Sequence, residues 1–553
     1  MIIDHHVQCP MRDGVLLSAD IYRPDSGGRC TTVLTRSCYT KVAKAFGGNQ
    51  DRAKFWTANG YVYMTQDVRG RGDSSGTFYP LRHETEDGSD TIDWIASQSW
   101  SDGRVVMIGG SYPGWTQLYA ACSRNSKLIA LVPMVTPADP DRGFPLSYGM
   151  IMPAAGAWLA FLDGHTNQEL NGDDLDRAYK HQPTFDFDRI LGRCLQSWRD
   201  WVTHAVRDHY WDSLAYQTRL LETSQHMLHV SGWYDDCLSG ALENFSRLIA
   251  RRYTDAAPLQ RLLVGPWLHG TIGQRKIGEL DYGEGAEVDL NQLQLEWFNT
   301  CLTARNVEEP LATVRLFMMG RNAWIEGTTW PLAHTQYIPF YLHSQGHANT
   351  RNGDGALSVE PPLDEPPDKF SYNPAKAVPY SPNVDFKQVG GPDNCAEIEL
   401  RDDVLVYTGP ILEAPLVICG PLRVKLYART TARDTDWTAK ILDVQPDGKA
   451  IRLNDGAIRA RFRNGHDREE FLRPGEIVHY DIDCWATCIE LPVGHRLRLE
   501  ISSSAFGKYD VNLNGGGPVG RESEPHIADQ SVFHNAKYPS HLVLPVLLEQ
   551  SVQ

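Results

Sequence analysis

A serine between small residues follows directly on a short apolar run. Residues 105–108 read Val-Val-Met-Ile and lead into Gly109-Gly110-Ser111-Tyr112-Pro113-Gly114, after which apolar residues recur at helical spacing. The pattern predicts a strand, a tight turn and a helix, an arrangement that presents a serine hydroxyl as a nucleophile. The second glycine of the usual Gly-x-Ser-x-Gly string is displaced to Gly114. The motif alone therefore leaves a purely structural turn open.

Two later loops supply an acid and a base for that serine. Asp235 follows the apolar run Leu228–Val230, and His269 follows Leu262–Val264. Serine, acid and histidine in this chain order, each after a strand, are typical of hydrolases that carry the nucleophile on a strand-to-helix turn. We expect His269 to accept the Ser111 proton and Asp235 to fix the imidazole tautomer.

An acyl-transfer site also needs hydrogen-bond donors for the oxyanion. The backbone N–H of Tyr112, next to the nucleophile, is a standard donor. The second donor usually comes from a loop after an early strand, often a His-Gly-Gly run, and the sequence has no such run. Thr35-Arg36-Ser37-Cys38-Tyr39 occupies that place, so the phenolic hydroxyl of Tyr39 is the second candidate.

Short apolar runs separated by helical patterns must position these residues. They predict βαβ units and a mostly parallel sheet, in which ligands bind beyond the carboxyl ends of the strands. The runs are Thr32–Thr35, Tyr61–Met64, Val105–Ile108, Leu228–Val230 and Leu262–Val264.

Two changes of pattern divide the chain. The sequence between residues 146 and 224 is rich in aromatic residues at helical spacing and predicts a helical cap. The proline-rich residues 361–367 lie in a long connection, and a series of short β-rich runs follows it. We therefore predict an α/β core, an inserted cap and a carboxy-terminal β-sandwich. The boundaries are residues 1–145 and 225–330 for the core, 146–224 for the cap and 331–553 for the sandwich.

Composition limits the partners. The net charge of -16 disfavours nucleic acid and anionic membranes. The densest basic stretch, Ile458–Arg463, alternates arginine with apolar residues and predicts a strand with one solvent-facing side. The sequence contains no run of about 18 consecutive apolar residues, so it predicts no membrane-spanning helix.

Eleven cysteines lack the spacing of a disulfide framework or a zinc site, so we expect no metal and no cofactor. Reduced thiols and the lack of a signal-like amino terminus favour a cytoplasmic protein. The sequence leaves a homo-oligomer open.

Many ordered motifs resemble one family, the cocaine-esterase and X-Pro dipeptidyl-peptidase family of α/β-hydrolases, over almost the whole chain. The resemblance implies a jelly-roll fold for the carboxy-terminal sandwich and an oxyanion hole made by the Tyr39 hydroxyl and the Tyr112 amide. The matching text is Met11–Leu17, Asp67–Gly72, Asp93–Ile95, Gln98–Val105, Gly109–Gly114, Gly232–Asp235, Gly265–His269, Ser503–Asp510 and Tyr538–Pro545.

The resemblance implies an ester or amide substrate of small size. Amino-acid ester hydrolases of the family place carboxylates two and three residues after the catalytic acid, whereas Cys237 and Leu238 stand there in this chain. We expect a carboxylic-ester hydrolase. An X-Pro dipeptidyl peptidase or other amide hydrolase, and an acyltransferase that uses the same acyl-enzyme, are the alternatives.

Four further residues are candidates for the substrate pocket. Asp236 is either a recognition group for a cationic substrate or a plain loop carboxylate, and Cys237 either widens an acyl pocket or is an inert thiol. Trp158 and Phe161 of the cap either line an apolar site or pack in the cap interior.

Overall fold

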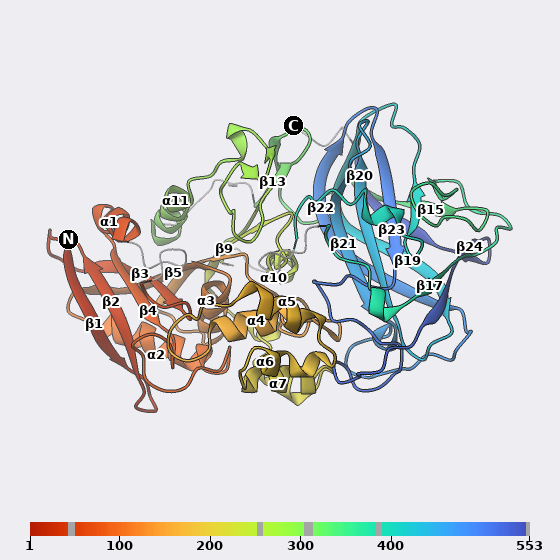
Figure 1. Cartoon of the computed structure of the whole chain (residues 1–553). Helices are drawn as coiled ribbons and strands as arrows, with labels where there is room; N and C mark the ends of the chain where they lie inside the picture. The colour runs from red at the N-terminus through yellow and green to blue at the C-terminus, as the bar shows by residue number, and fades with distance from the viewer. Residues whose placement is uncertain (43–49, 252–257, 304–312, 383–389, 549–553) are drawn as a thin grey trace.

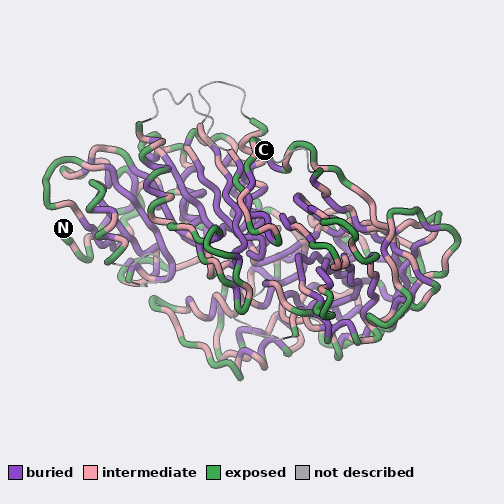
Figure 2. Tube along the Cα trace, turned by 90° about the horizontal axis from the view of Figure 1, so that it is seen from above, coloured by how far each residue is buried: buried purple, intermediate pink, exposed green. Residues whose placement is uncertain are grey.

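The computed structural model describes residues 1–42, 50–251, 258–303, 313–382 and 390–548 of the chain. A sheet formed by strands between residues 2 and 327 and a β-rich unit formed by strands between residues 335 and 547 lie side by side, with short helices between them at one edge (Figure 1). Buried chain runs through both units, and exposed chain lies mostly at the periphery (Figure 2). Across the described residues, no helix combines the length and apolar character needed to cross a membrane.

The first sheet is parallel at its centre. Seven neighbouring strands, from β4 to β13, run parallel, and antiparallel strands complete both edges. All five strands predicted for this half of the chain are present. In spatial order the sheet contains β1 (Ile2–Pro10), β2 (Leu16–Arg23), β4 (Val62–Asp67), β3 (Cys30–Ser37), β5 (Ser101–Gly110), β6 (Leu128–Met134), β9 (His226–Gly232), β10 (Gln260–Gly265), β13 (Val314–Met318) and β14 (Ala323–Gly327).

Helices cover both faces of this sheet, which explains the continuous apolar runs of its central strands. Side chains of β5 alternate between two apolar clusters: Val105 and Met107 face one, and Val106 and Ile108 face the other. The first cluster includes residues of α2 (Glu84–Ser97) and α3 (Tyr112–Cys122), and the second includes residues of α1 (Gln50–Ala58) and α11 (Leu290–Thr303). A further helix, α10 (Leu238–Ala250), packs against β9 and β10.

The segment between β6 and β9 is helical, in agreement with the predicted cap. Trp198, Trp201 and Trp211 are each at most 2% exposed and belong to the same apolar cluster as residues of α3 and β5, so this segment shares a core with the first sheet. The elements are β7 (Leu146–Ser147), β8 (Met150–Ile151), α4 (Pro153–Phe161), α5 (Gly172–Lys180), η2 (Thr184–Asp186), α6 (Phe187–Ile190), α7 (Gln196–Thr203), α8 (His209–Leu214) and α9 (Gln217–Leu220).

The second unit is a twelve-stranded, almost wholly antiparallel sheet that wraps around one core. That core also includes Trp233, Phe245 and Phe317 of the unit that holds the first sheet, so the two units share buried apolar surface. The strands are β15 (Thr335–His343), β16 (Ala356–Ser358), β17 (Asp368–Tyr372), β18 (Leu405–Thr408), β19 (Leu416–Thr430), β20 (Asp436–Val444), β21 (Ala450–Arg459), β22 (Val478–Leu491), β23 (Arg496–Ser502), β24 (Ala528–Asn535), β25 (Tyr538–Pro539) and β26 (His541–Leu547).

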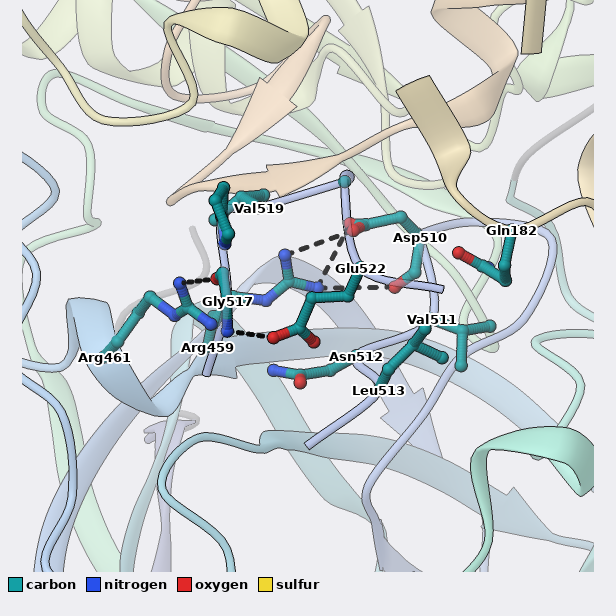
Figure 3. Close-up of a pocket in the computed structure, with 12 residues that line it drawn as sticks. Gln182, Arg459, Arg461, Asp510, Val511, Asn512, Leu513, Gly517, Val519 and Glu522 are labelled. Atoms are coloured by element: carbon teal, nitrogen blue, oxygen red, sulfur yellow. Dashed lines mark hydrogen bonds and ion pairs between the residues drawn. The ribbon is translucent and has the colours of Figure 1, made fainter. Parts of the chain in front are cut away.

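The prediction of a solvent-facing strand at residues 458–463 is wrong. Strand β21 ends at Arg459, residues 460–462 form a 3₁₀ turn, and Arg459 and Arg461 are each 2% exposed. Arg459 donates to both carboxylate oxygens of Asp436 at 2.9 Å and to Asp510 at 3.1 Å (Figure 3). Buried carboxylates replace water as the partners of these arginines, and an alternating sequence pattern does not show such partners.

Candidate active site

Ser111 lies at the turn between β5 and α3. Its φ of 64° and ψ of -127° are rare for a residue with a side chain, so the turn holds the serine in a strained conformation. The turn is tight: a Cβ on Gly109 would come within 2.5 Å of Pro113 Cβ. The serine is half-buried at the carboxyl end of a central strand, as the sequence predicted for a nucleophile.

The displaced glycine of the motif has a physical reason. A Cβ on Gly114 would lie 1.8 Å from the hydroxyl oxygen of Thr136 and 3.2 Å from the carbonyl oxygen of Met134. The first turn of α3 therefore touches the chain that leaves β6, and only glycine fits there. Pro113 occupies the first turn of the helix, where its missing N–H removes no hydrogen bond.

Asp235 and His269 are held together by the loops after β9 and β10. The Nδ1 atom of His269 lies 2.8 Å from Oδ1 of Asp235, which is fully buried. Asp235 also accepts hydrogen bonds from the Ser231 hydroxyl at 2.6 Å and from the Cys237 N–H at 3.1 Å. These donors hold the carboxylate in the orientation that fixes the histidine ring.

The environment of His269 favours its protonated form. Burial lowers the pKa of His269, but the charge of Asp235 and its hydrogen bond outweigh burial, so the net pKa lies above its ordinary value. Among the described residues, His269 and Ser111 are not joined by a hydrogen bond. Such contacts often tighten only when substrate binds.

The two predicted oxyanion donors lie at Ser111. The Tyr39 hydroxyl is 3.4 Å from Ser111 Oγ and accepts a hydrogen bond from Trp158 Nε1 at 3.0 Å. The indole N–H is the donor in that bond, so the bond to Trp158 does not use the hydroxyl proton of Tyr39. The N–H of Tyr112 is at the first position of α3, where no intrahelical acceptor exists.

A buried arginine, missed by the sequence analysis of the site, holds the Tyr39 loop in place. Arg71 is 0% exposed and donates to the carbonyl oxygen of Cys38 at 2.7 Å, to that of Leu162 at 2.5 Å and to Oδ1 of Asn167 at 2.8 Å. Asn167 in turn donates to the carbonyl oxygen of Tyr39 at 3.0 Å. The only sequence signal was the place of Arg71 in the Asp67–Gly72 motif.

The candidates for the substrate pocket lie in different surroundings. Trp158 is part of the site, since it bonds Tyr39 and its ring lies 5.8 Å from that of Tyr112. Phe161, one turn along α4, packs against the apolar cluster that the cap shares with α3. Cys237 is 6% exposed and lies beside Asp235, and burial raises the pKa of its thiol.

Asp236 faces the β-sandwich. It lines a cavity of about 10 Å³ together with Tyr380, Arg452 and Trp485, and its carboxylate makes no hydrogen bond among the described residues. Burial raises the pKa of Asp236 to about 7, although the nearby Lys508 opposes the shift. The side chain is thus neither a plain surface carboxylate nor a direct neighbour of Ser111 in any recorded contact.

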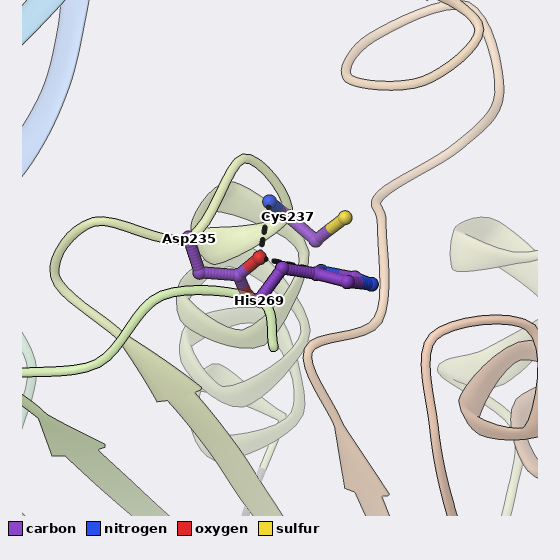
Figure 4. A group of neighbouring side chains, drawn as sticks. All are labelled: Asp235, Cys237 and His269. Carbon is purple, nitrogen blue, oxygen red and sulfur yellow. Dashed lines mark hydrogen bonds and ion pairs between the residues drawn. The ribbon is translucent and has the colours of Figure 1, made fainter. Parts of the chain in front are cut away.

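Three side chains at the site have the chemistry of metal ligands. One donor atom each from Asp235, Cys237 and His269 lies within 4.8 Å of the other two (Figure 4). The first two residues are buried, and the His269 side chain is 38% exposed.

Comparison with known proteins agrees with this architecture. Residues 13–271 match the family model described as X-Pro dipeptidyl-peptidase (S15 family), and residues 306–543 match that of the X-Pro dipeptidyl-peptidase C-terminal non-catalytic domain. The chain is 34% identical to cocaine esterase of Rhodococcus sp. (strain MB1 Bresler), over 98% of each chain.

Solved structures share the fold across both units. An aminopeptidase from the marine sediment archaeon Thaumarchaeota archaeon and an α-amino acid ester hydrolase each superpose with a TM-score of 0.87 at 24% identity. Each match covers 99% of this chain and 96% of the other.

The parallel sheet, with a serine at the turn into its central helix, defines a serine hydrolase of the α/β-hydrolase fold. Within that class, the chain belongs to the X-Pro dipeptidyl-peptidase (S15) family, which includes cocaine esterase-like hydrolases. The predicted fold class and enzyme class are confirmed. The domain boundaries and the roles of individual site residues stay predictions.

Proposed function

We propose that the protein hydrolyses carboxylic esters through an acyl-enzyme on Ser111. The observation that carries the proposal is the Tyr39 hydroxyl 3.4 Å from Ser111 Oγ, on a strained turn. A phenol in that position has a use in acyl transfer, because negative charge develops there on the carbonyl oxygen. The bonded pair of Asp235 and His269 on the neighbouring loops supports the same reading.

The chemistry follows from these positions. Ser111 Oγ attacks the ester carbonyl while Nε2 of His269 takes its proton, and Asp235 stabilises the imidazolium. The Tyr39 O–H and the Tyr112 N–H donate to the oxyanion. His269 then protonates the departing alcohol, and a water molecule activated by the same ring releases the acid.

The type of bond that is cleaved is inferred from similarity to known proteins. Identity of 34% to a cocaine esterase over nearly the whole chain favours an ester. The family description names an X-Pro dipeptidyl-peptidase, so cleavage of an amide after a penultimate proline is the second candidate. Acyl transfer to an alcohol or amine would use the same intermediate.

Two measurements on the full-length protein test the proposal. A serine-reactive fluorophosphonate should label the native protein and not the Ser111→Ala variant, and mapping of the labelled peptide should locate the adduct at Ser111. Equal labelling of both proteins would remove Ser111 as the nucleophile.

The substrate class needs a paired comparison. We expect a chromogenic acyl ester to be hydrolysed with a kcat/KM at least about 10²-fold above that of a Gly-Pro anilide, and both rates to vanish in Ser111→Ala. Faster cleavage of the anilide would replace the ester assignment with the peptidase one. Partition of the acyl group between water and added alcohol or amine would reveal a transferase.

A further inference from the structure

The thiol of Cys237 completes a set of three metal-binding side chains around the hydrogen bond between His269 and Asp235. Nδ1 of His269 lies 2.8 Å from Oδ1 of Asp235, and the Cys237 N–H donates to that same oxygen at 3.1 Å. One donor atom of each residue lies within 4.8 Å of the others. In Figure 4 the Cys237 sulfur and the His269 ring lie on the same side of the Asp235 carboxylate.

The three donor atoms are near enough for one tetrahedral cation to bind them once the side chains close around it. Zinc binds sulfur at about 2.3 Å and nitrogen or oxygen at about 2.0–2.2 Å, so two ligand atoms on one ion lie about 3.3–3.6 Å apart. A move of about half an ångström between His269 and Asp235 would reach that spacing. Thiolate and imidazole ligands favour zinc over magnesium or calcium, and a carboxylate is also a common zinc ligand.

We propose that Asp235, Cys237 and His269 form an inhibitory site for a thiophilic divalent cation such as Zn²⁺. The ion takes the place of the proton between His269 and Asp235. This proton moves to Nε2 of the imidazole, which stays neutral, and the thiol proton of Cys237 passes to solvent. Water fills the fourth position. The thiolate and the Asp235 carboxylate balance the charge of the ion, and the ion reaches the site along the exposed side of His269.

Inhibition follows from what the ion occupies. An imidazole bound to zinc through Nδ1 carries its proton on Nε2, so it cannot accept the Ser111 proton. A carboxylate bound to the same ion cannot stabilise an imidazolium. This consequence rests on the proposed roles of Asp235 and His269, whereas binding of the ion does not. Binding and inhibition are therefore measured separately.

Binding is measured by titrating the full-length protein with Cd²⁺ and recording the ultraviolet charge-transfer absorption of the cadmium–thiolate bond. We expect the wild type to show one more equivalent of this signal per chain than Cys237→Ser or Cys237→Ala. The matched control is Cys194→Ser, because Cys194 is an exposed free thiol on the cap and not part of the set. Equal signals in wild type and both Cys237 variants, with folding confirmed by circular dichroism, would overturn the site.

Inhibition is measured as the ester hydrolysis rate against Zn²⁺, with each variant normalised to its own metal-free rate. We expect the half-inhibiting concentration to rise at least about tenfold in Cys237→Ser and Cys237→Ala, to stay unchanged in Cys194→Ser, and EDTA to restore the rate. Equal sensitivity of wild type and Cys237 variants would contradict the proposal. A cadmium signal that depends on Cys237 without inhibition would keep the metal site and instead remove Asp235 and His269 from the mechanism.

Discussion

The hydroxyl of Tyr39 is the side-chain group that argues most strongly for acyl transfer at this site. It lies between the Trp158 N–H, which donates to it, and Ser111 Oγ at 3.4 Å. Burial raises the pKa of this phenol far above its ordinary value, so it remains protonated and able to donate at any working pH. A neutral donor that is already oriented loses little free energy when the oxyanion forms.

Replacement of Tyr39 by Phe tests this role. We expect kcat for an ester to fall by about 10²-fold or more with a smaller change in KM, because the donor acts mainly on the transition state. The matched control is Tyr61→Phe, which removes a hydroxyl bonded to Asn299 on α11, far from the serine in the chain. A Tyr39→Phe rate within twofold of wild type would exclude the phenol from the mechanism.

The sequence was enough to select the candidate catalytic residues, and it did not show all the contacts that support them. Ser111, Asp235 and His269 stand out because each follows a strand in the order that a parallel sheet brings to one edge. The contact of Gly114 with Thr136 depends on how the turn into α3 meets the chain that leaves β6. Nothing in the local sequence shows that contact.

At the scale of elements, the loop after β3 is fixed to the cap and not only to its own sheet. The planar guanidinium of Arg71 bonds Cys38 in that loop and also Leu162 and Asn167 just beyond α4. Five N–H donors in one rigid plane can bridge two segments in this way, whereas an ammonium group cannot. Arg71 is therefore a positioning residue for Tyr39.

Arg71→Lys keeps the charge and removes the planar fork. We expect kcat to fall by about tenfold to 10²-fold while KM changes less, because Tyr39 shifts by a fraction of an ångström. Arg69→Lys is the control, since Arg69 pairs with Asp13 and Asp87 and does not bond the Tyr39 loop. Equal losses in both variants would point to a general effect on folding, and a thermal denaturation curve for each checks that directly.

The elements themselves were predictable where a strand is buried on both faces. Tyr61–Met64 and Leu262–Val264 form uninterrupted apolar runs because helices cover both sides of the sheet. Strand β19 is harder to recognise as one strand, because Gly420 and Pro421 interrupt an apolar pattern that continues through a bulge. The predicted exposure of Arg459 and Arg461 was wrong for a different reason. The carboxylates that pair with them are distant in the chain, so the local sequence does not reveal them.

At the scale of the whole molecule, the β-sandwich holds the entrance of the cap. Asp510 accepts a hydrogen bond from the N–H of Ile151 at 2.7 Å, its own N–H donates back to Ile151 at 2.8 Å, and its carboxylate pairs with Arg459 (Figure 3). All of these groups are buried. The sandwich thereby fixes where the chain enters α4, the helix that carries Trp158.

Asp510→Ala tests this connection. We expect a loss of about 3 kcal/mol, because Arg459 and the Ile151 N–H lose a buried partner. Calorimetry should show the first thermal transition lowered by about 5 °C or more, and limited proteolysis should cut first between residues 146 and 224. Asp529→Ala, an exposed site on the same sandwich, is the control and should leave both readings unchanged. A first transition at the wild-type temperature would mean that the sandwich does not restrain the cap.

The bond from Trp158 to Tyr39 sets a limit on exchange of parts between relatives. A cap is a convenient segment to exchange between relatives when a new substrate range is wanted. It borders the site, and the chain connects it to the core at only two places. In this chain the transplanted cap must also carry an indole where Trp158 lies and an amide where Asn167 lies, or the recipient loses the orientation of its own phenol. Chimeras chosen for pocket shape alone would then be slow on every substrate, including those that fit.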